Sequence, residues 1–321
     1  MGDSDVLDAL TRRGDVLRRL REGPAHKRDL VAEMAHSRST IDRSIRELEQ
    51  LDLVRRGEDG FAATMAGRLA VDRLGAFETA IEDLTAAEEV LEPLPPGAPV
   101  THAAVAGGEA RLAADPAPYR PLERLHDALA EAERYRAVLP ALDGSRHVRV
   151  LYEHVVTDDR PAEMVVTPGL FETLREEFPR QTAAMAEREG FRAFVTDDAP
   201  PFALTLAEGG DATGSTASAG TAETDGETRV SVVVFAETGA VHGVLENATP
   251  GAVSWASELF ADVRSRATER TDALTADTDG GVRTSDAGRS RDGPARPAPV
   301  GQSLPVSLER AGFVRLDAPY F

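Results

Sequence analysis

The side chains of this chain that are best suited to bind a charged partner lie between residues 38 and 56. The guanidinium of Arg43 could fork onto the O6 and N7 atoms of guanine, a contact that discriminates between bases by about 1–3 kcal/mol. The hydroxyl groups of Ser39 and Thr40 suit hydrogen bonds to phosphates or base edges. The candidate residues are Arg38, Ser39, Thr40, Arg43, Ser44, Arg55 and Arg56. These residue types predict a surface that binds double-stranded DNA.

The sequence around these residues predicts two short helices joined by a tight turn. A first helix begins near Lys27, and a second follows the turn at His36. In the second helix, Ile41, Ile45 and Leu48 are spaced by four and three residues, which predicts one buried stripe.

The rest of the second helix is expected to face solvent or a partner. The residues off the apolar stripe are Arg38, Thr40, Arg43, Ser44 and Glu47. Ser37 or Ser39 can cap the helix through a side-chain oxygen. We assign Arg46 to an internal salt bridge because Asp42 and Glu49 lie near it in the sequence. The alternative for the remaining arginines is an ordinary solvated helix face.

A β-hairpin is predicted directly after the second helix. Residues 53–56 indicate a strand, residues 57–60 its glycine-flanked tip, and residues 61–63 the returning strand. Two helices followed by such a hairpin are typical of a winged helix-turn-helix, which places its second helix in the DNA major groove. Arg55 and Arg56 in the wing suit phosphate or minor-groove contacts, which orient the protein without specifying a sequence.

The charge of the whole chain argues against nucleic acid, but its distribution does not. The chain has 36 Lys and Arg residues against 55 Asp and Glu residues, a net charge of −19, and Lys27 is its single lysine. Residues 1–60 hold 12 basic and 13 acidic residues, so nearly all of the negative charge lies beyond them. Such an acidic, lysine-poor composition resembles that of proteins from salt-accumulating halophiles.

Residues 65–92 predict one long amphipathic helix. Its large apolar residues follow alternating steps of three and four, broken at Glu88: Leu74, Phe77, Ile81, Leu84 and Leu91. This seam could pack on its own domain or against a second copy of the chain. Helix-turn-helix proteins usually bind paired half-sites, which favours a homodimer.

The remainder of the chain predicts an α/β domain with a mixed sheet. We divide the chain into a winged helix-turn-helix domain at 1–64, a connecting helix and linker at 65–97, and an α/β effector domain at 98–321. Predicted strands alternate there with predicted helices, which favours packed layers. The expected elements include a helix over 121–142 and a strand over 147–152.

Two segments of the effector domain are predicted to be disordered. The segments near 207–228 and 272–303 are rich in small and polar residues, so they cannot bury enough apolar surface to offset chain entropy. Residues 304–321 turn apolar again and are expected to return to the core as a helix and a strand.

Other chemistries find little support in the sequence. The chain has no cysteine, no G-x-S-x-G elbow and no P-loop, and its seven histidines show no metal-ligand spacing. His147 and His154 are seven residues apart, so on the expected strand they would face opposite sides. Together with Arg146 and Tyr152 they could face a sensor pocket or be ordinary strand residues. We therefore expect no enzyme activity, cofactor or metal.

No apolar run is long enough to span a membrane, and the first residues lack the apolar region of a signal peptide. These features predict a cytoplasmic protein.

The pattern resembles that of a known family, the archaeal winged helix regulators of methanogenesis and filamentation, which are common in haloarchaea. The matching residues are Arg38–Leu48, Leu53-Val54, Pro121–Leu125, Leu139-Pro140, Val165–Pro168, Trp255-Ala256 and Gly312–Leu316. The resemblance implies sequence-specific DNA binding coupled to an effector domain. In related sugar-responsive regulators, that domain binds small molecules and resembles the phospholipase D fold without its catalysis.

The sequence therefore predicts a DNA-binding transcription regulator with a domain that senses a small-molecule effector or receives another signal. Two alternatives remain open: an enzyme that uses the N-terminal helices for docking, and a winged helix that binds protein.

Overall fold

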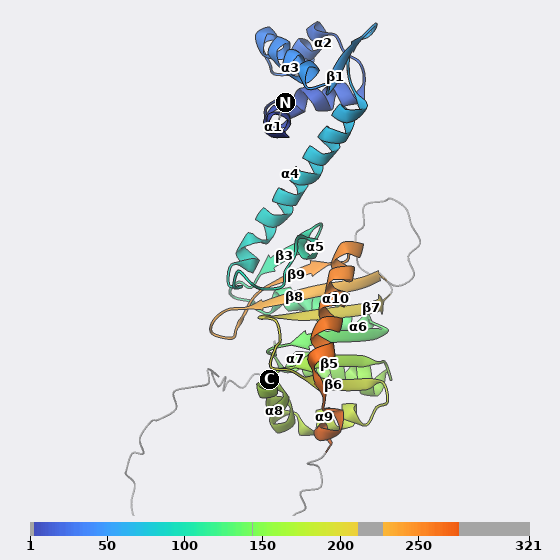
Figure 1. Cartoon of the computed structure of the whole chain (residues 1–321). Helices are drawn as coiled ribbons and strands as arrows, with labels where there is room; N and C mark the ends of the chain where they lie inside the picture. Colours follow the sequence, from blue (N-terminus) through green and yellow to red (C-terminus); the bar gives the residue numbers. More distant parts are fainter. Residues whose placement is uncertain (1–2, 143, 211–226, 276–321) are drawn as a thin grey trace, which may run out of the picture. The chain divides into compact units, whose positions relative to one another are not determined.

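The computed structural model describes residues 3–142, 144–210 and 227–275. The chain divides into two compact units, Met1–Thr85 and Ala86–Phe321 (Figure 1). Of the predicted disordered segments, residues 211–226 and 276–303 lie outside the described residues, as do residues 304–321. Each unit is considered by itself below.

The first unit is a winged helix-turn-helix, as predicted. Its elements are α1 (Asp3–Glu22), α2 (Lys27–Glu33), α3 (Arg38–Gln50), β1 (Val54–Gly57), β2 (Gly60–Ala63) and the first part of α4 (Met65–Leu91). The strands pair antiparallel in the register Val54↔Ala63, and Ala25 forms an additional bridge with Phe61. Gly60 adopts a φ of +114°, and a Cβ there would lie 2.5 Å from the carbonyl oxygen of Ala25. The wing thus depends on a glycine at this position.

The apolar stripe of α3 forms the centre of the first core. Ile41, Ile45 and Leu48 are all fully buried, and they pack with apolar residues of α1 and α2 such as Leu17 and Leu30. Spacing by four and three residues brings these side chains to one side of the helix, as the sequence predicts.

Two glycines mark places where helices pack closely in the first unit. Gly14 lies inside α1, which continues through it, and a Cβ there would lie 2.6 Å from Leu74 Cδ2. Gly67 is buried in α4, where a Cβ would lie 2.0 Å from the carbonyl oxygen of Leu53. A Cβ at Gly14 would meet the end of a flexible side chain, whereas a Cβ at Gly67 would meet rigid backbone.

The described part of the second unit is built on an eight-stranded sheet in the order β10-β6-β5-β4-β7-β8-β9-β3. The strands are β3 (Glu109–Leu112), β4 (Arg134–Leu139), β5 (Ala162–Val166), β6 (Phe191–Val195), β7 (Phe202–Gly210), β8 (Glu227–Phe235), β9 (Val241–Asn247) and β10 (Thr268–Glu269). The β4–β5 and β5–β6 pairs are parallel and the others antiparallel. The predicted mixed α/β fold is therefore confirmed.

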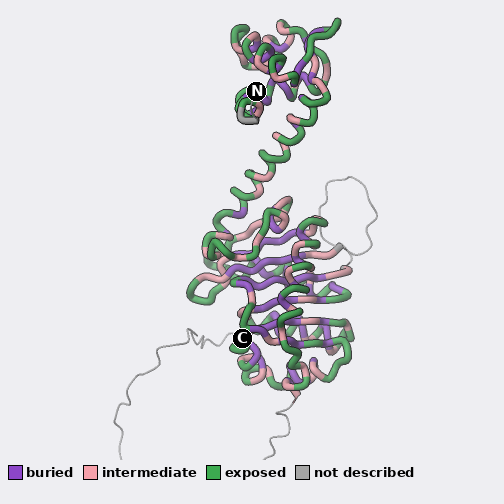
Figure 2. The backbone as a smooth tube through the Cα atoms, in the orientation of Figure 1, coloured by how far each residue is buried: buried purple, intermediate pink, exposed green. Residues whose placement is uncertain are grey.

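Helices cover both faces of this sheet (Figures 1 and 2). Their bounds are α5 (His102–Val105), α6 (Glu123–Glu131), α7 (Ser145–Tyr152), α8 (Pro168–Glu177), α9 (Pro179–Ala186) and α10 (Pro250–Arg266), with short turns η1 (Arg120–Leu122), η2 (Glu153–Thr157) and η3 (Thr271–Leu274). One core contains residues of α6 to α9, and the other contains α5, α10 and the end of α4. Successive residues of β4 alternate between them, with Tyr135, Ala137 and Leu139 in the first core and Val138 in the second.

Two predicted elements of this unit are wrong. The expected helix over 121–142 ends at Glu131, and its remainder contains the central strand β4. The expected strand over 147–152 is the helix α7. Both stretches are short apolar runs, whose periodicity fits either element; pairing of β4 with β5 and β7 decides the first case.

The predicted disorder is also wrong where the structure describes it. β7 continues to Gly210 and pairs with Glu227 of β8, so the strands extend into the predicted loop. Residues 271–274 form η3, in which Leu274 is buried.

The predicted linker after α4 packs against a core of the second unit through Leu94 and Ala98. None of the described helices is long and apolar enough to cross a membrane.

The close packing of Gly67 yields a stability prediction. We expect Gly67→Ala to destabilise the first unit by about 1–3 kcal/mol, because the new methyl group would collide with backbone. The free energy of unfolding is measured by urea titration with far-UV circular dichroism. Fluorescence of Trp255, the chain's single tryptophan, reports the second unit separately.

Gly75 is the matched control, because it lies in the same helix with no atom near its would-be Cβ. Gly75→Ala should stabilise the first unit by about 0.5–1 kcal/mol, the ordinary helix preference for alanine. Equal effects of the two substitutions would contradict the packing argument.

Candidate nucleic-acid interface

The first turn of α3 is held by a network of hydroxyl groups. Ser37 is the N-cap, and its Oγ accepts a hydrogen bond from the Thr40 backbone N–H at 3.1 Å. The same Oγ lies 2.9 Å from both Ser39 Oγ and Thr40 Oγ1. Of the two predicted caps, the structure thus selects Ser37, and the hydroxyls of Ser39 and Thr40 are held at the start of the helix.

The outward face of α3 is defined by its buried stripe. Each helical residue turns by about 100°, so Ser39, Arg43, Arg46 and Gln50 lie opposite Ile41, Ile45 and Leu48. All four are exposed. The two arginines are separated by less than one turn and face the same side, so both could reach into one groove of a duplex.

Ser44 does not belong to this face. It is 1% exposed, and its Oγ donates a hydrogen bond to the Thr40 carbonyl at 2.9 Å. The prediction that it faces outward is wrong, because its position follows the buried side of the helix. We leave Ser44 out of the candidate interface.

Arg46 also differs from its prediction. Its expected partner Asp42 instead pairs with Lys27 of α2, with Nζ 2.8 Å from Oδ1. The hydrogen bond with Lys27 lowers the pKa of the Asp42 carboxyl. Arg46 forms no salt bridge among the described residues, although its charge also helps to lower the pKa of the Asp42 carboxyl, and its side chain is exposed on the outward face.

The ion pairs of the first unit separate its basic residues into two groups. Those of α1 and α2 pair with carboxylates: Arg12, Arg13, Arg18, Arg19, Arg21, Lys27 and Arg28. Those of α3, the wing and early α4 have no ion pair among the described residues: Arg38, Arg43, Arg46, Arg55, Arg56, Arg68 and Arg73. The unpaired positive charge of a nearly neutral region is therefore concentrated on α3 and its neighbours.

The wing adds two of these arginines. Arg55 and Arg56 are exposed in β1, opposite Ala62 and Phe61 of β2. The tip beyond them holds Glu58, which would repel phosphate. The strand of the wing, rather than its tip, thus presents the cationic surface. Arg68 at the start of α4 is a further exposed arginine, which sequence reasoning missed because its neighbours form an unremarkable helical pattern.

The second unit holds a cluster of buried aromatic and imidazole groups around Tyr135. The rings of His126 and His147 lie 5.8 Å apart, and those of Tyr135 and His154 lie 6.4 Å apart. Tyr135 Oη is 3.3 Å from His147 Nε2. His147 and His154 do not face opposite sides as expected, because a separation of seven residues returns to one side of a helix. Both are buried.

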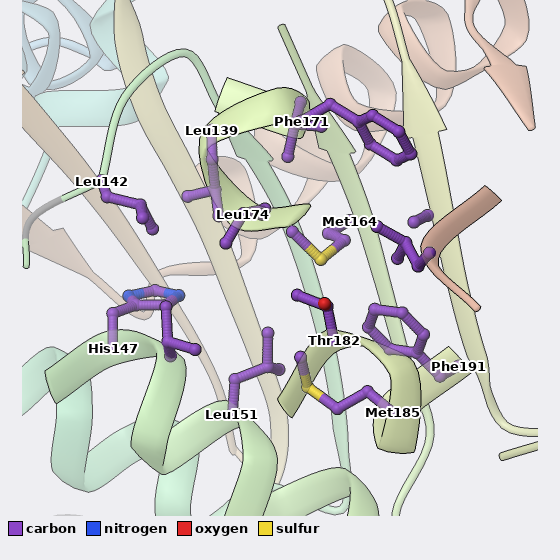
Figure 3. Close-up of a pocket in the computed structure, with 14 residues that line it drawn as sticks. Leu139, Leu142, His147, Leu151, Met164, Phe171, Leu174, Thr182, Met185 and Phe191 are labelled. Atoms are coloured by element: carbon purple, nitrogen blue, oxygen red, sulfur yellow. The ribbon is translucent and has the colours of Figure 1, made fainter. Parts of the chain in front are cut away.

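Neither this cluster nor the adjoining cavity makes a binding site. No group of three potential metal ligands occurs among the described residues. The cavity beside His147 is enclosed by apolar residues such as Leu139, Met164 and Phe171 (Figure 3). Its volume is only about 10 Å³, which leaves room for one water molecule at most.

Comparison with known proteins finds one family match for each unit. Residues 118–266 match the family described as methanogenesis regulatory protein FilR1, middle domain. Residues 1–86 match the family described as the HVO_A0261 N-terminal domain. Among curated proteins no match is found.

Two solved structures show a weak likeness. The archaeal chromatin protein TrmBL2, whose structure is described as showing a novel mode of DNA binding, is 9% identical with a TM-score of 0.37, over 76% of this chain and 87% of that chain. The dimethyltransferase RosA from Streptomyces davawensis is 17% identical with a TM-score of 0.20, over 61% of this chain and 64% of that chain. These TM-scores are too low to support an argument about fold or function.

The buried His154 yields a prediction of pH dependence. Burial lowers the pKa of its imidazole, and Nε2–H donates to the Pro161 carbonyl at 3.2 Å. The unfolded chain therefore binds a proton more readily below about pH 6.5, the ordinary histidine pKa. The free energy of unfolding of the second unit should be highest above that pH and should fall as the pH drops below it. Urea titrations followed by Trp255 fluorescence at graded pH measure this slope.

His154→Gln should remove part of the slope below about pH 6.5. His102→Gln, at an exposed position of the same unit, is the control and should leave the slope unchanged. An unaltered slope in His154→Gln would show that other groups dominate.

Proposed function

We propose that this chain is a sequence-specific DNA-binding transcription regulator, and the match of residues 118–266 to the methanogenesis regulatory protein FilR1 middle domain supports the proposal. The observation that carries the proposal is the set of exposed, unpaired arginines on α3 and the wing of a winged helix-turn-helix. We propose that the second unit is its effector domain and that it acts in the cytoplasm, where an archaeal genome lies.

The outward face of α3 supports direct reading of bases. In this module the second helix enters the major groove with its first turns against the base edges. Arg43 and Arg46 are the residues we assign to guanine O6 and N7, because both are exposed on the outward face and neither forms a salt bridge in the part of the chain that the structure describes. Ser39 lies on the same face, one turn before Arg43, and suits a phosphate or base contact.

The other exposed groups fit phosphate contacts. The free backbone N–H groups of the first turn of α3 carry the positive end of the helix dipole, which favours a nearby phosphate. Arg38 stands at this end, and Thr40 is half-buried beside it. Arg55 and Arg56 on the wing would contact the backbone of the duplex and fix the orientation of α3.

The acidic balance of the chain is compatible with this assignment. Basic residues of α1 and α2 form salt bridges with the nearby carboxylates Glu47, Glu33 and Asp42. These acids are therefore neutralised close to the interface. The negative surface elsewhere opposes non-specific attraction to polyanions. Specific contacts of a few arginines, rather than bulk charge, would then determine affinity.

The exposed seam of α4 supports a homodimer. Phe77, Ile81 and Leu84 are 62%, 46% and 43% exposed, although they are large and apolar. Leu74, one step earlier, packs against the first core, and Leu91 packs against the second, so the middle of the seam is uncovered. Steps of four and three residues suit self-association of two α4 helices, and a dimer matches paired half-sites.

DNA recognition is tested by substitution on the outward face of α3. Bound sites are first selected from genomic fragments, and affinity for the best site is measured by fluorescence anisotropy. We expect Arg43→Ala and Arg46→Ala each to weaken specific binding by about 1–3 kcal/mol and to relax preference at one base pair. Arg55→Ala and Arg56→Ala should weaken binding to all sequences alike.

Arg21→Ala is the control, because Arg21 is exposed but paired with Asp72 at 2.7 Å. It should leave specific affinity within about twofold of the wild type. Wild-type binding without sequence preference, or unchanged binding after both substitutions on α3, would refute the proposal.

The dimer is tested separately on α4. Ile81→Glu should convert a dimer to a monomer in light scattering coupled to size exclusion, because a buried carboxylate at the seam would lose its hydration. Leu69→Glu is the control, since Leu69 is exposed on the same helix but lies to one side of the seam. A monomeric wild type, or equal masses for wild type and Ile81→Glu, would contradict the assignment.

A further inference from the structure

The second unit contains an open groove that none of the functions above uses. The groove lies between α7 and the junction of α8 with α9, and its volume is about 650 Å³. This space matches ordinary small-molecule sites, which span about 300–1,000 Å³. It differs from the cavity of Figure 3, which has room for no more than a water molecule.

Three arginines give the groove its charge. Arg146, Arg149 and Arg180 all line it and are exposed, and none forms an ion pair among the described residues. No Asp or Glu lines the described part of the groove. In a chain with 55 acidic residues, such a cluster of one sign is an exception.

Other arginines of this unit show that carboxylates are ordinarily close by. Those in ion pairs are Arg111, Arg124, Arg134, Arg136, Arg175, Arg188, Arg192, Arg264 and Arg266. Clustered like charges repel one another unless an anion neutralises them. The three arginines of the groove therefore lack the carboxylate partners that these other arginines have.

The surrounding polar groups also favour an anion. Arg146 and Ser145 stand in the first turn of α7, and Arg180 and Gln181 stand in the first turn of α9. Neither helix has a side-chain hydrogen bond at its N-cap. The backbone N–H groups of both first turns thus reinforce the positive potential of the arginines.

The remaining lining residues are apolar or aromatic. Val148 is buried, and Tyr152 and Phe178 are half-buried. Ser145, Arg149 and Tyr152 follow spacing of four and three residues, so one side of α7 presents a hydroxyl, a guanidinium and a phenol together. A carbon skeleton could rest on the rings while the arginines bind its charged groups.

We propose that this groove binds a small organic molecule carrying at least two phosphate or carboxylate charges, as the effector of the regulator. Guanidinium groups bind both kinds of oxyanion through paired N–H donors. The role of this molecule as an effector rests on the proposed function, whereas its binding in the groove does not.

Isothermal titration of the full chain with pyrophosphate and with citrate tests the site without DNA. We expect saturable binding of at least one of them, weakened about tenfold or more by Arg149→Gln, and likewise by Arg146→Gln or Arg180→Gln. Arg120→Gln removes the same charge from an exposed position outside the groove and should leave affinity unchanged within about twofold. Far-UV circular dichroism and Trp255 fluorescence check that each variant is folded.

Absence of binding by both probes, or equal affinity in all the groove variants and the wild type, would overturn the proposal. A loss of DNA affinity in the groove variants with unchanged binding of both probes would also overturn it, since the groove would then contact nucleic acid. Anion binding by a chain that shows no DNA binding would refute the regulator and leave the anion site standing.

Discussion

Ile41, Ile45 and Leu48 of α3 are completely buried against α1 and α2, and this packing fixes the rotation of the helix about its axis. Everything proposed for the first unit depends on that rotation. With the stripe buried, Ser39, Arg43 and Arg46 must face outward, and Ser44 must face inward. A helix whose apolar residues were spread around its circumference would have no such fixed outward face.

Ion pairing then decides which arginines are available. Glu47 accepts hydrogen bonds from Arg12 and Arg13, and Asp42 is held by Lys27, so two of the three acids of α3 are occupied by its neighbours. The arginines of α3 and the wing are left exposed without carboxylates. The same contrast recurs in the second unit, where many arginines form ion pairs but the three that line the groove form none among the described residues. In an acidic chain, the absence of a nearby acid is more informative than the presence of a base.

The two proposed sites use the same chemistry for different ligands. Both combine guanidinium groups with the first turns of helices, which suits oxyanions. The α3 face is convex and fits the groove of a duplex, whereas the α7–α9 groove is hollow and fits a small molecule. The uncovered residues of α4 would add a second copy of the chain, and with it a second recognition helix for a paired site.

The sequence by itself determined the winged helix-turn-helix, because its helices and hairpin are set by local spacing, capping and turn residues within forty positions. It also determined the class of the second unit as α/β. It could not decide whether 134–139 and 147–152 were helix or strand, since a short apolar run fits both until its neighbours are known. Tertiary structure alone decided that Asp42 pairs with Lys27 and not with Arg46, and that Arg180 joins Arg146 and Arg149 at one groove. Those contacts join residues from different elements, and their physical cause is the packing of helices on one another and on the sheet, which local spacing does not encode.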